Sequence, residues 1–162
     1  MPQRQGRRSL GRPLSMTSAA MMLALSGCSG TGESLPATEF PLFAPELDGA
    51  QPEQTTISGG VVSTTYDNGA QLVQTAAPAG SLCAALRDVR MAGDVCRERA
   101  GGVVVTRMEE MSGVALVRDE TLLFWQSLVT EADSDLLARA ERSLRLAPPA
   151  TSADLGAVTA PR

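Results

Sequence analysis

The sequence predicts an α+β fold: a small antiparallel sheet of about five strands with two helices packed on one face. Segments rich in β-branched residues alternate with turn residues, and two further segments carry apolar residues at helical spacing. The expected order of elements is β-β-α-β-β-β-α. No internal repeat or heptad pattern suggests another architecture.

The first half of the domain is predicted to form a hairpin followed by a helix. Residues 61–66 are rich in valine and threonine, which favour strands. Residues 67–69 read Asp-Asn-Gly, which tolerate a positive φ, so we expect a turn with residues 71–75 as the return strand. Residues 79–91 carry apolar side chains three or four positions apart, which indicates a helix.

The second half is predicted to add three strands and a second helix. Residues 102–108 contain a continuous valine run, typical of a central strand that is covered on both faces. Residues 113–117 and 121–129 are two more strands, with a turn at 118–120. Asp133 or Ser134 can cap a helix through residue 146, which has leucines and an alanine on one face.

The first 27 residues have the pattern of an export signal. Four arginines precede a short apolar run over residues 14–25, which is too short to span a membrane as a helix. The run ends in Leu25-Ser26-Gly27-Cys28, which resembles the lipobox of bacterial lipoproteins. This resemblance implies that residues 1–27 are removed and that Cys28 carries the lipid that holds the protein on the extracytoplasmic face of the cell membrane.

Two questions about this signal stay open in the sequence. A plain secretory signal would share the same basic and apolar regions. Arg7-Arg8 also resembles a twin-arginine export signal, so the general and the twin-arginine routes are both compatible with the residues.

The abundance of alanine, glycine and arginine resembles the composition of a GC-rich bacterium such as an actinobacterium.

The remaining chain is predicted to divide into three parts. Residues 28–54 are acidic and rich in proline, which indicates an extended tether, and residues 55–147 form the globular domain. Residues 148–162 are expected to be a disordered tail. Phe40 and Phe43 do not suit a tether, and they either pack back on the domain as an edge strand or contact a partner.

Composition excludes several classes of function. From Cys28 onward, ten arginines face eighteen acidic residues, a formal charge of −8, so we expect no binding of nucleic acid. The chain contains no histidine and no lysine. Catalytic triads and dyads that need histidine, histidine metal sites and Schiff-base chemistry are therefore excluded. We expect no enzymatic activity, no metal and no cofactor.

The two cysteines after Cys28 are expected to form a disulfide. Outside the cytoplasm, Cys83 and Cys96 can pair in only one intramolecular way. A redox-active pair is the alternative, but the spacing differs from the Cys-x-x-Cys arrangement that lowers the pKa of a thiol.

Other candidate sites have ordinary structural interpretations. Glu109 and Glu110 would point to opposite faces of a strand, so they cannot act as a carboxylate pair. Asp133-Ser134-Asp135 lacks the glycine and distal glutamate of a calcium loop, and Gly101-Gly102 lacks the lysine of a phosphate loop. Trp125 is either a core residue or an exposed interface anchor.

The expected function is that of a non-enzymatic, lipid-anchored protein that binds another envelope component. The order of elements is similar to that of small envelope lipoproteins and anti-sigma-type sensor domains, which implies an accessory or sensor-type role. The candidate contact residues for an envelope protein partner are Trp125, Phe40 and Phe43. The alternative is a carrier that holds a hydrophobic small molecule between the sheet and the helices.

Overall fold

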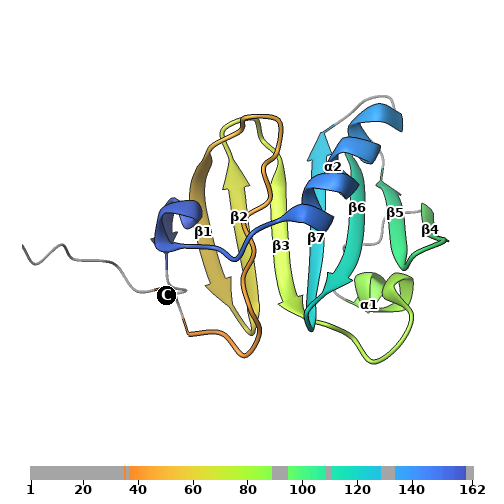
Figure 1. Ribbon diagram of the computed structural model, residues 1–162. Coiled ribbons are helices and arrows are strands. Elements are labelled where there is room, and N and C mark those ends of the chain that lie inside the picture. The colour runs from red at the N-terminus through yellow and green to blue at the C-terminus, as the bar shows by residue number, and fades with distance from the viewer. Residues whose placement is uncertain (1–34, 36, 89–94, 109–110, 129–133, 160–162) are drawn as a thin grey trace, which may run out of the picture. The chain divides into compact units, whose positions relative to one another are not determined.

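The computed structural model describes residues 35, 37–88, 95–108, 111–128 and 134–159. These residues form one eight-stranded mixed sheet with two α-helices and a short 3₁₀ helix (Figure 1). In chain order the elements are β1 (Pro52–Ser58), β2 (Val61–Tyr66), β3 (Gln71–Ala76), α1 (Leu82–Asp88), β4 (Val95–Arg99), β5 (Val103–Met108), β6 (Met111–Arg118), β7 (Thr121–Leu128), α2 (Ser134–Leu146), η1 (Ser152–Leu155) and β8 (Ala157–Thr159).

The strands lie in the order β4-β5-β6-β7-β3-β2-β1-β8, and the predicted five-stranded antiparallel sheet is therefore wrong. Neighbouring strands are antiparallel except for β8, which pairs with β1 in parallel. The five predicted strands are present, and β1, β4 and β8 are additional. The additional strands lack apolar patterning because two of them are the edges of the sheet and the third is mostly polar.

The first face of the sheet, which we call the α2 face, carries the larger part of the core. Leu137, Ala140 and Leu144 lie three or four positions apart on α2, and all three are buried. They pack over β6 and β7, where the side chains of Val114 and Leu123 point toward the helix. The predicted apolar face of this helix is thus the face that it buries.

The second face, which we call the α1 face, is covered by α1 over the central strands. Leu86 of this helix packs with Val104 and Phe124 of the sheet. The two helices therefore lie on opposite faces, which corrects the prediction that both pack on one face. Because the centre of the sheet is covered on both sides, the adjacent residues Phe124 and Trp125 are both buried. Gly113 leaves room for the Phe124 ring, since a Cβ there would lie 2.6 Å from its Cε2 atom.

Residues 37–48, which we call the strap, cross the α2 face over β2 and β3 (Figure 1). Phe40 and Phe43 are buried there, so the expectation that this segment packs back on the domain is confirmed. The strap is not an edge strand, because its one described β-bridge joins Phe43 to Pro149. The predicted tether over residues 28–54 therefore overlaps the folded domain. The strap packs on the domain through its apolar side chains, although the segment is acidic.

The predicted disordered tail also belongs to the domain as far as residue 159. Leu155 in η1 is buried against Phe40 and Val62, which fixes the chain beside β1. Thr55 donates a hydrogen bond to the Leu155 carbonyl, and β8 then pairs with β1. A single buried leucine among small and polar residues was too weak a pattern to indicate this structure.

Cys83 and Cys96 form the predicted disulfide, with their Cα atoms 5.8 Å apart. The bond joins α1 to β4, the strand at one edge of the sheet. α1 has only two turns, and a helix of this length is marginal by itself. The disulfide therefore fixes both a short helix and an edge strand.

We expect reduction of this disulfide to lower the free energy of unfolding by roughly 3 kcal/mol, the loop-closure contribution for a loop of this size. Urea unfolding of the full chain with and without reductant measures the change. A Cys83→Ala/Cys96→Ala variant serves as the control and should not respond to the reductant. Equal midpoints for the oxidised and the reduced protein would contradict the assignment of a stabilising bond.

Candidate binding groove along α2

A groove of about 340 Å³ lies between the strap and the second half of α2. The strap contributes Glu46 and Asp48 to one wall, and α2 contributes Arg139 and Arg142 to the other. Pro148, just after the helix, closes one end. The groove thus exists only because the strap folds back beside the helix.

Two polar contacts join the walls of this groove. Arg139 Nε lies 3.3 Å from Asp48 Oδ2, and Ser143 Oγ donates a hydrogen bond of 2.6 Å to the Glu46 carbonyl. The ion pair is about half exposed, so it contributes less than about 1 kcal/mol to stability. It joins the strap to α2 across the groove.

The rim of the groove presents a cation and an apolar side chain to solvent. Within the described ranges, Arg142 has neither an acidic partner nor a hydrogen bond. Leu146 is 74% exposed at the end of α2. Both side chains are free to contact a bound molecule.

A recess of about 50 Å³ adjoins the groove and shares Asp48, Arg139 and Ser143 with it. Trp125 lines this recess, and its buried indole nitrogen has no hydrogen-bond acceptor among the residues described. An unsatisfied buried donor costs about 1–3 kcal/mol. The recess is large enough for a water molecule, and the indole nitrogen is itself buried.

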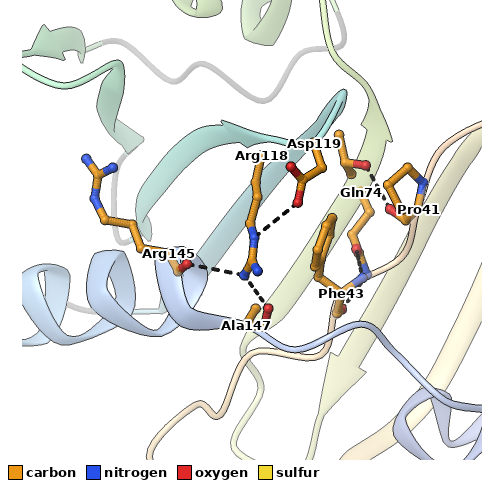
Figure 2. Close-up of polar contacts among 8 residues, drawn as sticks. Pro41, Phe43, Gln74, Arg118, Asp119, Arg145 and Ala147 are labelled. Atoms are coloured by element: carbon orange, nitrogen blue, oxygen red, sulfur yellow. Dashed lines mark hydrogen bonds and ion pairs between the residues drawn. The ribbon is translucent and has the colours of Figure 1, made fainter.

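The side chain of Gln74 holds the strap on the sheet (Figure 2). Its amide nitrogen donates to the Phe43 carbonyl at 3.0 Å, and its amide oxygen accepts from the Phe43 N–H at 2.8 Å. Thr121 adds a hydrogen bond of 2.7 Å to the Pro41 carbonyl. These bonds satisfy backbone groups of the strap that no neighbouring strand pairs.

Arg118 joins the strap to the end of α2 (Figure 2). Its guanidinium donates to the carbonyl of Arg145 at 3.2 Å and to that of Ala147. The same group lies 4.6 Å from the centre of the Phe43 ring, a cation–π distance. A cation at the carboxyl end of a helix also interacts favourably with the helix dipole. Arg118 therefore fixes the end of the groove that α2 and the strap share.

The three aromatic residues predicted as partner contacts lie in the core. Phe40, Phe43 and Trp125 are 6%, 3% and 4% exposed, so none presents its ring at the surface. Trp125 is the one of the three that borders the recess. The other predicted site residues Cys28, Glu109, Glu110 and Asp133 lie outside the described residues.

The described part of the chain contains a buried tyrosine close to the core of the α2 face. Burial, and secondarily the charge of Asp154, raises the pKa of Tyr66 to about 12, so its hydroxyl stays protonated near neutral pH.

No cluster of three potential metal ligands occurs in the part of the chain that the structure describes. In the same part, no helix has the length and apolar character needed to cross a membrane.

Sequence reasoning did not identify Arg142 and Leu146 as candidate site residues. Each lies on the outer side of a predicted amphipathic helix, where arginine and an occasional leucine are ordinary. The groove also depends on the position of the strap. The apolar periodicity of the helix does not predict where the strap lies.

Comparison of the chain with protein-family models, with curated proteins and with solved structures finds no match.

We expect Gln74→Leu to lower the free energy of unfolding by about 2–4 kcal/mol, because it leaves the buried N–H and carbonyl of Phe43 without partners. Urea unfolding measures the loss, and hydrogen exchange at the Phe43 amide should accelerate. Gln71→Leu in the same strand is the control, since among the described residues that side chain bonds only Gln126 and it is partly exposed. Similar effects of the two variants would show that the strap does not depend on Gln74.

Proposed function

We propose that this protein is a lipid-anchored extracytoplasmic protein without catalytic activity, and that its α2 groove binds a segment of an envelope protein partner. The observation that carries the proposal is the juxtaposition of the exposed Leu146 and of Arg142, which has no acidic partner among the described residues, on the rim of the groove. A polypeptide segment supplies the complementary groups: carbonyl acceptors, acidic side chains and apolar side chains.

The charges that line the groove suit a polar occupant. The walls of the groove carry charges of both signs, which favours a polar segment held by a few directed contacts over a purely apolar ligand.

The resemblance of residues 25–28 to a lipobox supports attachment to the membrane through Cys28. Eight residues separate Cys28 from the start of the strap, and such a segment can span at most roughly 30 Å. The domain would then stay close to the membrane surface. A partner in or near the same membrane would therefore be within reach of the groove.

The alternative of a carrier for an apolar small molecule has less support. Leu137, Ala140 and Leu144 fill the space between the middle of α2 and the sheet. The recess beside them holds about 50 Å³, whereas a small-molecule site needs about 300–1,000 Å³. The α2 groove has such a volume, but charged side chains of both signs line it, which does not suit an apolar ligand. We therefore favour a protein partner.

We expect Cys28→Ala to remove the protein from the membrane fraction or to leave an unprocessed precursor, because the acyl chains that retain it could no longer be attached. Fractionation of cells that express the full chain measures this. The Cys83→Ala/Cys96→Ala variant should remain at the membrane. A processed Cys28→Ala protein that still fractionates with membranes would contradict lipid anchoring.

We expect a photoreactive amino acid at position 146 to form a discrete protein adduct in intact cells. The same group at position 56, which is exposed on the α1 face, is the control and should not form that adduct. Arg142→Gln should reduce the yield, because it removes a charged donor from the rim of the groove. Equal adducts from both positions, or no protein adduct from position 146, would contradict binding in the groove.

A further inference from the structure

A second cavity, of about 280 Å³, lies at the other end of α2, where β4 and β5 pass beside the start of the helix. We call it the arginine pocket because Arg97, Arg99 and Arg107 line it. Val105 and Leu137 form an apolar part of its wall. The α2 groove borders the second half of the helix, so the two cavities are separate.

The strand register brings the three arginines to one face of the sheet. Arg97 and Arg99 are two positions apart in β4, so their side chains leave the strand on the same side. Arg97 pairs with Val105, and Arg107 pairs with Val95. Arg97 and Arg107 are thus diagonal neighbours, with backbones about 7–8 Å apart. The positive charges at this separation repel one another, and an anion bound between them would offset that repulsion.

No acidic side chain neutralises this cluster within the part of the chain that the structure describes. The described ion pairs use Arg118, Arg139 and Arg145, and none of the three pocket arginines has a hydrogen bond to a residue that the structure describes. The acidic residues that the structure describes in β4 and in the first turn of α2 are already engaged. Glu98 leaves β4 on the opposite face and accepts a hydrogen bond from Ser81, and Asp135 in the first turn of α2 has an interaction of its own.

We propose that the arginine pocket binds a phosphate-bearing ligand. The planar guanidinium group donates two parallel hydrogen bonds to phosphate oxygens, and three such groups match the two negative charges that a phosphate monoester approaches near pH 7. Val95, Val105 and Leu137 give the uncharged part of the ligand an apolar surface. A soluble glycerol phosphate and the headgroup of an anionic phospholipid share this chemistry.

This site does not depend on the proposed function of the α2 groove. It requires neither a protein partner nor Trp125, and its residues belong to β4, β5 and the start of α2. A failure of the crosslinking experiment would leave it untouched. A failure of phosphate binding would equally leave the groove untouched.

The test uses the full-length protein in nanodiscs of phosphatidylcholine, titrated with glycerol phosphate and with inorganic phosphate in a calorimeter. We expect saturable binding that Arg97→Gln weakens about tenfold or more, since it removes charged hydrogen bonds. Arg107→Gln on the neighbouring strand should give a similar loss. Arg87→Gln, an equal change of charge at an exposed position of α1, should leave the affinity within about twofold.

A second set of nanodiscs that contain phosphatidylglycerol distinguishes the two sources of phosphate. If the lipid headgroup occupies the pocket, the heat from added glycerol phosphate disappears, which supports the site with lipid as its ligand. If the heat persists, a soluble phosphate compound is the ligand, and the site is again supported. The proposal is overturned if neither phosphate probe binds saturably in phosphatidylcholine nanodiscs, or if Arg87→Gln weakens binding as much as Arg97→Gln does.

Discussion

The pair of hydrogen bonds between Gln74 and the backbone of Phe43 is the constraint on which the α2 face depends. A segment that lies across a sheet leaves its own N–H and carbonyl groups without strand partners, and burying them is costly. Gln74 is 1% exposed, and its side-chain amide supplies the hydrogen bonds to Phe43 that a neighbouring strand would otherwise supply. Arg118 then joins the strap to the end of α2. The groove therefore exists because these hydrogen bonds allow the strap to lie buried beside α2.

The positions of the arginines separate the two proposed sites. The domain is acidic overall, yet Arg97, Arg99 and Arg107 gather near the start of α2, and Arg142 lies on the outer side of the same helix. Net charge governs the long-range field of a protein, whereas local clusters decide what binds at short range. An acidic protein can therefore repel nucleic acid and still recognise a small anion.

Much of the central sheet could be predicted from sequence, because its strands and α2 follow simple apolar periods. β1 was not predicted because its buried side chains do not form an apolar pattern. Thr55 and Ile57 point toward the α2 face, and Thr55 is buried as a hydrogen-bonding group. The disulfide followed from the number of cysteines. The groove and the arginine pocket could not be predicted, because each needs a register or a chain reversal that local patterns do not encode.

The parallel pairing of β8 with β1 has a consequence for the order in which the protein folds. Thr55 and Leu155 meet although 100 positions separate them, and Leu42 bonds Ala150 across a similar interval. Contacts of this range form late, since the intervening chain must first be brought together. Until residues 150–155 have left the ribosome, the strap lacks its contacts with them. During that interval its phenylalanines are a hazard for aggregation, which chaperones would have to suppress.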